Sequence, residues 1–516
     1  MTTSMSRRIL NGALVGWGSQ VVGTLLRLLL TPMLFASLTR VEVGTWYLLG
    51  STISALQLAE FGMLTALTRR IAMAKGRVDL GSEEGVRGAA KSELIELIEI
   101  GRVSFRWRAL FALVAGLSVG SVYILSLDLE EPVRDQALAA WGILVAGHCL
   151  QIYFGYLSAI IMGLGLVASG ATIGGAVAIA MTLGQIGIVM GGGGLVGLAM
   201  VAVAGPLALK QLQLWLLRRG HPALLSERAA WNQTLFVSMV RPALTTWLTT
   251  ASFFAISRVD NFFITSHLGL HDVARFQPAI QVCTAIQMAA LMLANTSGFF
   301  ISQTWGVRDE ERIRRMLSAS IRFALFFLAA GLAVIIGVSD QLFLSWLGDA
   351  DLISTPIIIA LAVKVTLEGL VHIYVNTLRS IENDRSSFIY VLAACLNLPL
   401  TWLLIQRYGL IGVAASTFLA QVLTVGPFVL YEARRQFALS IRRTLVMPAL
   451  EALPLFGCCL VAAIEIRACM AGAGRLEALA VVLASAAVAG VMLAFAVYIR
   501  VLTPAQRHWI AGIVKW

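Results

Sequence analysis

The chain has 516 residues, of which 58% are hydrophobic and 13% are charged, and its mean hydropathy is +0.83. Soluble domains carry about 25% charged residues, so this composition excludes a water-soluble globular protein and indicates a polytopic membrane protein. The formal net charge is +11, but the sequence offers no folded basic domain, so we expect no nucleic acid among its partners.

Apolar runs of about 20 residues recur from end to end, and each is long enough to cross the ~30 Å hydrocarbon core as a helix. Segments of alternating hydrophobicity, which transmembrane strands would require, do not recur. We therefore predict an all-α polytopic membrane protein with about fourteen transmembrane helices. The predicted spans are 10–35, 43–67, 109–127, 137–162, 166–190, 194–216, 240–266, 274–301, 320–345, 355–378, 387–406, 410–431, 445–466 and 478–500.

The flanks of these spans carry very unequal positive charge. The side that holds both chain ends carries 29 Lys and Arg residues, the opposite side carries 6, and the remaining 4 lie within spans. The positive-inside rule therefore predicts that both termini are cytoplasmic. The only sizeable segment outside the spans is a cytoplasmic loop at 68–108. Its stretch ELIELIEIGR, 93–102, alternates acids and aliphatics at helical spacing, which predicts an amphipathic helix on the membrane surface.

Two pairs of short segments indicate an internal repeat. GLVGLA at 194–199 aligns with GLIGVA at 409–414, and LTRVEVGTW at 38–46 aligns with LGLHDVARF at 268–276. Spans 1–6 therefore correspond to spans 7–12, as a parallel repeat about a pseudo-two-fold axis along the membrane normal, which is typical of transporters. The predicted domains are an N-terminal six-helix lobe at 1–217, a cytoplasmic linker at 218–239, a C-terminal six-helix lobe at 240–431, and appended helices 13 and 14 with a cytoplasmic tail at 432–516.

Charged residues inside spans are the strongest functional signal, because a charge at the centre of a spanning helix costs about 2.5–3.5 kcal/mol. Arg258 and Asp260 lie in the seventh span, and Arg27 lies at the matching depth of the first span. Arg27 shares a polar stripe with Gln20 and Thr24. One interpretation is a pair of arginines that binds a phosphate-bearing group, since guanidinium binds phosphate oxygens bidentately. The other is a structural role in which Arg258 extends toward the outer interface.

A second polar stripe lies in the tenth span. Lys364, Glu368, His372 and Asn376 are spaced by four residues and share one helical face. Either Lys364 and Glu368 form a self-satisfied pair on a packed helix, or the stripe lines water and Glu368 or His372 changes protonation during transport. Glu60 in the second span has the same two interpretations, an ion-coupling carboxylate in a cavity or an acid that reaches the inner interface.

Patterns that would indicate an enzyme fail in their context. GLSVG at 116–120 matches a nucleophile elbow but lies within a predicted span, and GGGGLVG at 191–197 follows no strand. The sequence contains no Walker A motif, no HExxH motif and no Cys/His cluster. We therefore expect a transporter rather than an enzyme, with no catalytic residues, no metal site and no cofactor other than H⁺ or Na⁺ as a coupling ion.

Three stretches resemble a known family. VEVGTWYLLGSTISALQLAEFGMLTALTRRIA at 41–72, RVDNFFITSHLG at 258–269 and RYGLIGVAAST at 407–417 are similar to motifs of polysaccharide-export (O-antigen) flippases. The resemblance implies two six-helix bundles around a central cavity, a fold shared with multidrug/toxin extruders and the lipid II flippase. It also implies the location, a bacterial inner membrane, and the substrate, a polyprenyl-pyrophosphate-linked oligosaccharide.

Under this resemblance, the pyrophosphate would bind Arg27 and Arg258, with positive charge added by Lys364. The coupling ion would be carried by Asp260, Glu368 or His372. Membrane lipids, a polysaccharide polymerase and glycosyltransferases are the expected partners. Two alternatives stay open: a cation-coupled drug extruder of the same fold, and a membrane-embedded glycan polymerase or ligase.

Overall fold

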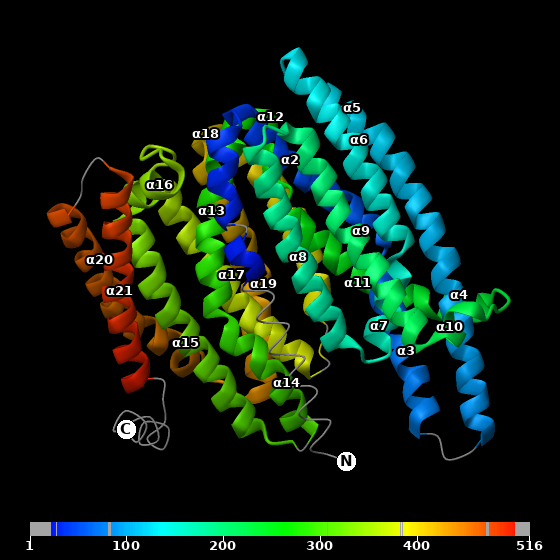
Figure 1. Ribbon diagram of the computed structural model, residues 1–516. Helices are drawn as coiled ribbons and strands as arrows, with labels where there is room; N and C mark the ends of the chain where they lie inside the picture. The colour runs from blue at the N-terminus through cyan, green and yellow to red at the C-terminus, as the bar shows by residue number, and fades with distance from the viewer. Residues whose placement is uncertain are drawn as a thin grey trace, which may run out of the picture. The chain divides into compact units, whose positions relative to one another are not determined.

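The computed structural model describes residues 22–26, 28–80, 84–306, 308–381, 383, 385–470 and 474–500. Almost all of these residues are helical, and no strand occurs among them (Figure 1). Nine helices in these ranges are long and apolar enough to cross a membrane, and a bent pair makes ten if it counts as one span. The predicted all-α polytopic fold is therefore confirmed.

The chain divides into two compact units, Met1–Asn261 and Phe262–Trp516. The first unit contains α2 Arg40–Leu56, η1 Gln57–Glu60, α3 Met63–Leu80, α4 Glu84–Ala115, η2 Gly116–Gly120, α5 Ser121–Leu125, α6 Glu131–Tyr153, α7 Gly155–Gly163, α8 Val167–Met190, α9 Gly194–Gly220, α10 Pro222–Ser226 and α11 Gln233–Ser257. The boundary falls within α12, Asp260–His267. The sequence places the lobe boundary earlier, at 218–239, whereas α11 packs with α3 in the first unit.

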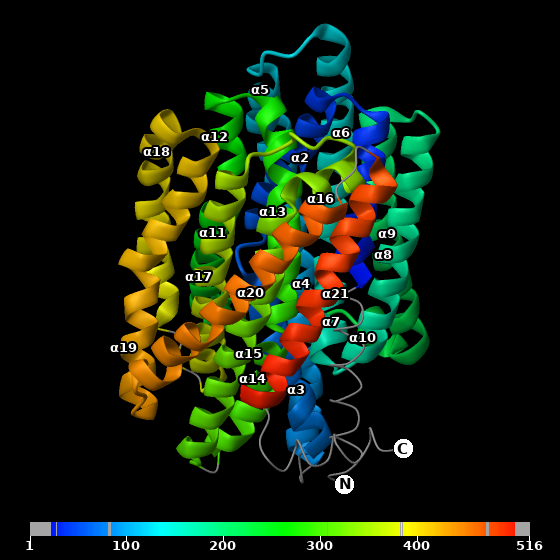
Figure 2. The same cartoon turned by 90° about the vertical axis from the view of Figure 1, so that its left-hand side faces the viewer.

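The second unit contains α13 Leu270–Ala290, α14 Met292–Gly306, α15 Glu310–Gly337, α16 Ser339–Leu347, α17 Thr355–Ser380, α18 Ser386–Leu423, α19 Val425–Phe437, η3 Arg442–Val446, α20 Met447–Met470 and α21 Arg475–Arg500. Helices α20 and α21, the predicted appended pair, pack along α15 (Figure 2). Ala330 and Ala333 of α15 meet Cys459 and Ala463 of α20 and Val481 of α21 in one buried apolar cluster. Small residues at this contact let the helix backbones approach closely.

The glycines of the internal repeat have matching local geometry in the two units. Gly194 has φ +57° at the start of α9, and Gly409 has φ +54° at a kink inside α18. Three residues later, a Cβ on Gly197 would approach Ile188, and a Cβ on Gly412 would approach the backbone of Leu404. The 51-residue helical stretch Ser387–Phe437 is far longer than one crossing requires, and this kink divides it into the two predicted spans.

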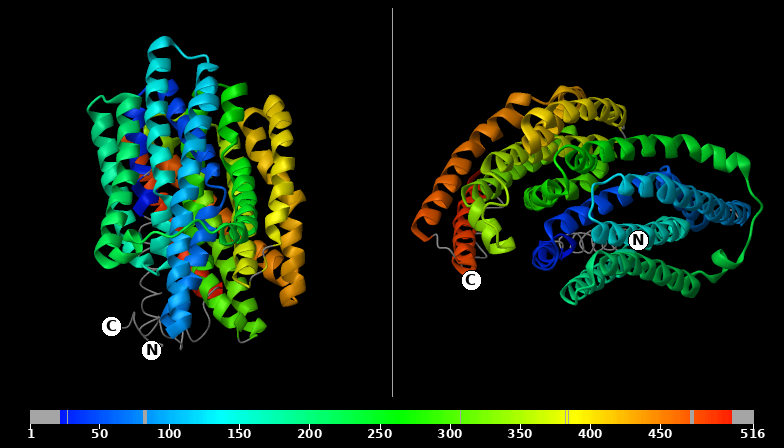
Figure 3. Two further views of the ribbon diagram at one scale, coloured as in Figure 1. Left: turned by 90° about the vertical axis from the view of Figure 1, so that its right-hand side faces the viewer. Right: turned by 90° about the horizontal axis from the view of Figure 1, so that it is seen from above.

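The segment 68–108 is not a loop, and this part of the prediction was wrong. Helix α3 continues to Leu80, and α4 begins at Glu84, so that the two form a helical hairpin (Figure 3). The amphipathic pattern at 93–102 is real, but its apolar side chains Leu94, Leu97 and Ile98 are buried in the first unit. The pattern indicated a helix with one apolar face, and it did not reveal that protein rather than lipid covers that face.

The second predicted span is broken in its middle. Helix α2 and the turn η1 end at Phe61 and Gly62, which have φ +47° and +67°, and α3 begins at Met63. A Cβ at Gly62 would lie 2.2 Å from the carbonyl oxygen of Ala243 on α11, so only glycine fits there. The indole of Trp247 donates a hydrogen bond of 2.8 Å to the carbonyl of Leu58. These contacts attach α11 to the break.

Candidate functional site

Only one member of the predicted arginine pair, Arg258, lies in the described part of the chain. Arg27 and Gln20 lie outside the described residues, and Thr24 is half-buried near the start of the described helix Val22–Ser37. Arg258 is the C-terminal cap of α11 and its side chain is exposed, whereas Asp260 opens α12 and is only 4% exposed. The seventh span is therefore two helices rather than the continuous helix that the sequence predicts, with Arg258 at the end of α11 and Asp260 at the start of α12.

The polar stripe in the tenth span lies on α17, and its residues form hydrogen bonds with the neighbouring helices α14 and α18. Lys364 is 2% exposed, and its Nζ lies 3.9 Å from Oε1 of Glu368. The amide of Gln421 on α18 donates to the same carboxylate oxygen at 3.4 Å. This burial and pairing favour the packing interpretation for Lys364.

The lower half of the stripe is more open. His372 is exposed, and its Nε2 lies 3.0 Å from Oδ1 of Asn295 on α14. Asn376 donates a hydrogen bond of 3.1 Å to the carbonyl of Ala294 on the same helix. Of the stripe residues, His372 therefore combines exposure with a titratable group.

A charged cluster in the first unit was not predicted as a group. Glu60 interacts electrostatically with Arg108 of α4 and Lys210 of α9. The ammonium of Lys210 donates to Oγ of Ser158 at 2.5 Å, and this hydroxyl lies 3.1 Å from Oε1 of Gln213. Sequence reasoning selected Glu60 and gave Lys210 no role, although Lys210 is the only charged residue in the span 194–216.

Arg108 was missed for a different reason. The sequence predicts that the third span begins at residue 109, which places Arg108 in the loop that precedes it. In the structure α4 is continuous through this position, and the guanidinium of Arg108 faces the ring of Phe105 at 5.8 Å. Its Nε and Nη1 atoms are buried and have no hydrogen-bond partner within the described part of the chain. The sequence does contain a signal for Arg108, because it is the last charged residue before nineteen uncharged residues and therefore lies at the edge of the membrane span.

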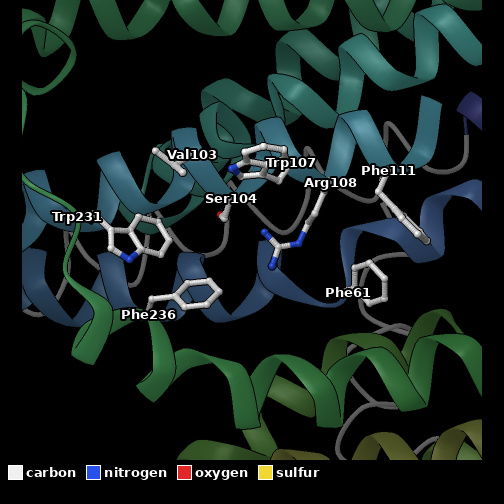
Figure 4. Close-up of a pocket in the computed structure, with 8 residues that line it drawn as sticks. All are labelled: Phe61, Val103, Ser104, Trp107, Arg108, Phe111, Trp231 and Phe236. Carbon is white, nitrogen blue, oxygen red and sulfur yellow. The ribbon is translucent and has the colours of Figure 1, made fainter. Parts of the chain in front are cut away.

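Arg108 also lines a pocket of about 540 Å³ within the first unit (Figure 4). The other lining residues are Phe61, Val103, Ser104, Trp107, Phe111, Trp231 and Phe236, of which five are aromatic. In Figure 4 the guanidinium lies between Trp231 and Phe236 at one end and Phe61 and Phe111 at the other. The pocket therefore offers one cation between two apolar ends.

No group of three or more His, Cys, Asp or Glu side chains in the described ranges is arranged to hold a metal ion. The GLSVG motif forms a π-helical turn, η2, inside a helical stretch. The indole N–H of Trp141 donates a hydrogen bond of 3.0 Å to the carbonyl of Gly116 in this turn. A π-helical turn within a helical stretch differs from the strand–turn–helix geometry of a nucleophile elbow.

No protein-family model matches the sequence, and no curated protein matches it. Among solved structures, lipid II flippase MurJ in an inward closed conformation matches with a TM-score of 0.66 at 13% identity, over 93% of this chain and 97% of its own. The fold is that of the MOP superfamily transporters. An inward-facing MATE multidrug transporter of this superfamily has a TM-score of 0.65 at 15% identity, over 82% of this chain and 99% of its own.

A third match is a MOP superfamily transporter from Pyrococcus furiosus, with a TM-score of 0.58 at 16% identity, over 84% of this chain and 95% of that one. Its description attributes a different function to the reverse polarity of its binding pocket. The fold is thus shared by proteins whose binding sites differ in charge, so the fold alone does not determine the substrate.

Proposed function

We propose that this protein is a flippase that moves a polyprenyl-pyrophosphate-linked oligosaccharide across a bacterial inner membrane by alternating access, for export of a surface polysaccharide. The observation that carries the proposal is the match to the lipid II flippase over 93% of this chain. The match to the MATE transporter covers 82%, and the difference is about as long as α20 and α21 together. The resemblance of the motifs at 41–72, 258–269 and 407–417 to polysaccharide-export flippases supports the same substrate class.

In this proposal, Arg27 and Arg258 bind the pyrophosphate, since two guanidinium groups suit its several anionic oxygens. The exposure of Arg258 at the end of α11 is consistent with a role in binding. Glu368, His372 and Asp260 are the candidates for ion coupling, with either H⁺ or Na⁺. Lys364 acts through its ion pair with Glu368 rather than by direct contact with substrate, because it is buried.

The direct test uses the purified protein in liposomes that contain a fluorescent polyprenyl-pyrophosphate oligosaccharide, with a membrane-impermeant quencher added outside. Wild-type protein should increase the rate at which the label becomes accessible, and Arg258→Gln should reduce that rate. Arg407→Gln is the matched control, because Arg407 is an exposed arginine at the kink of α18. Ethidium efflux from the same liposomes, without flipping of the labelled lipid, would instead show a drug extruder.

The test in cells compares Arg27→Gln and Arg258→Gln with wild type, at equal protein levels, by the amount of surface polysaccharide. Loss of export in either variant supports the clamp. Unchanged export in both variants rejects it, and the flippase proposal then depends on the liposome experiment alone.

A further inference from the structure

The pocket around Arg108 is lined by none of the residues to which the proposed function assigns a role, and its composition is distinctive. Five of its eight lining residues are aromatic, and the single charged side chain is Arg108. Trp107 and Trp231 are 66% and 41% exposed, so the pocket opens on the surface of the first unit. Its volume of about 540 Å³ lies within the range of about 300–1,000 Å³ that is typical of small-ligand sites.

The pocket lies where a membrane changes from polar to apolar. Arg102, Arg106 and Arg108 precede residues 109–127, which carry no charge, so Arg108 marks the level at which α4 enters the hydrocarbon. The charge bias of the sequence assigns this end of α4 to the cytoplasmic leaflet. Tryptophan is enriched at this level of a membrane, because its ring is apolar and its N–H is polar.

The guanidinium of Arg108 has unused capacity to donate. Nε and Nη1 have no hydrogen-bond acceptor anywhere in the described ranges of the chain. Its one acidic neighbour, Glu60, also interacts with Lys210, so two cations share one carboxylate. A buried donor without an acceptor is costly, and an anionic ligand with several oxygens would satisfy it.

The order of residues along the pocket matches the order of groups in a phospholipid. Trp231 and Phe236 lie at one end, Arg108 in the middle, and Phe61 and Phe111, whose ring centroids are 5.7 Å apart, at the other end (Figure 4). On α4, Phe111 lies inside the uncharged stretch and is therefore deeper than Arg108. A headgroup phosphate at Arg108 would have its acyl chain against Phe61 and Phe111.

We propose that this pocket is a binding site for an anionic phospholipid of the cytoplasmic leaflet, whose phosphate accepts hydrogen bonds from Arg108 and whose acyl chain packs against Phe61 and Phe111. Charge complementarity selects an anionic over a zwitterionic headgroup, since the pocket presents a cation and no acidic lining residue. The proposal does not depend on which substrate the protein transports.

The experiment uses the full-length protein in vesicles that contain brominated phosphatidylglycerol or, at the same mole fraction, brominated phosphatidylcholine. Bromine quenches tryptophan fluorescence at short range, and the part of the quenching that disappears in Trp231→Phe reports the pocket. The wild type should show half-maximal quenching of this part at about tenfold less phosphatidylglycerol than phosphatidylcholine. Arg108→Gln should remove the preference, and Arg108→Lys should keep part of it.

Arg106→Gln is the matched control. Arg106 lies two residues away on the same helix, is exposed and does not line the pocket, so this variant should keep the wild-type preference. No preference in the wild type, a preference that survives Arg108→Gln, or an equal loss in Arg106→Gln would overturn the proposal. If Arg108→Gln does not fold, the wild type, Arg108→Lys and Phe111→Ala decide, and Phe111→Ala should weaken binding of phosphatidylglycerol, because Phe111 contacts the acyl chain in this proposal.

Two competitors distinguish the sources of the phosphate. Glycerol phosphate at concentrations equal to the lipid should not relieve the quenching, because it lacks the acyl chain, and full relief would show a site for a free phosphate compound. An undecaprenyl phosphate that displaces phosphatidylglycerol at a much lower mole fraction would assign the pocket to the lipid carrier. Either result would overturn the assignment to a phospholipid.

Discussion

The Arg108 pocket in the first unit and the α17 stripe in the second unit both place a cation among apolar side chains. Lys364 lies 3.9 Å from Glu368, which also accepts a hydrogen bond from Gln421, and only 2% of Lys364 is exposed. Arg108 has two donor atoms, Nε and Nη1, without an acceptor in the described residues, and it lines a pocket of about 540 Å³. The difference separates a cation that the protein itself neutralises from one that is available to a ligand.

The largest effect should come from Lys364→Ala. The substitution removes the counter-ion of Glu368, and it empties the space of a side chain that is only 2% exposed, which in a packed interior costs about 2–5 kcal/mol. We expect a large drop in the thermal midpoint of the detergent-solubilised protein. The double variant Lys364→Met/Glu368→Leu should recover much of this loss, because it removes both charges and preserves volume. An unchanged midpoint in Lys364→Ala would show that this pair does not stabilise the fold.

The second effect tests the break that forms one wall of the pocket. Gly62→Ala places a Cβ 2.2 Å from the carbonyl oxygen of Ala243 at a residue with φ +67°, so we expect a loss of about 1–3 kcal/mol from backbone strain alone. Gly88→Ala is the matched control, because Gly88 is helical and a Cβ there would have no neighbour within 4 Å. It should raise the stability by about 0.5–1 kcal/mol. Thermal unfolding of both variants measures the difference, and equal midpoints would contradict the geometry at Gly62.

The sequence was sufficient for the fold class and for most helix positions, because apolar runs and positive flanks report directly on the membrane. The glycine pairs Gly194/Gly197 and Gly409/Gly412 were visible as a repeat, and the structure shows that each pair supplies a positive φ and a close helix contact. The breaks at Phe61 and Arg258 were not predicted, because no proline marks them and the charges beside them, Glu60, Arg258 and Asp260, were assigned to continuous spans. They depend on tertiary contacts such as that of Gly62 with α11.

The candidate sites show the same limit. The spacing of Lys364, Glu368 and His372 predicted one face of a helix, and the structure adds which residues of α14 and α18 they meet. The cluster of Glu60, Arg108 and Lys210 joins residues that are 48 to 150 positions apart in sequence. No local pattern contains that information, and the error of one residue in the predicted start of the third span hid Arg108 within a loop that does not exist.

The smallest effect is expected for the substitution of Arg108. Arg108→Gln should change the thermal midpoint by an amount equivalent to less than about 1 kcal/mol, because Nε and Nη1 lose no protein hydrogen bond and Lys210 still balances Glu60. The measurement is made first in detergent without anionic lipid. Added phosphatidylglycerol should then raise the midpoint of the wild type and of Arg106→Gln, since a ligand stabilises the state that binds it, but not that of Arg108→Gln. A loss in detergent as large as that of Lys364→Ala would place Arg108 with Lys364, as a cation whose role is to hold helices together.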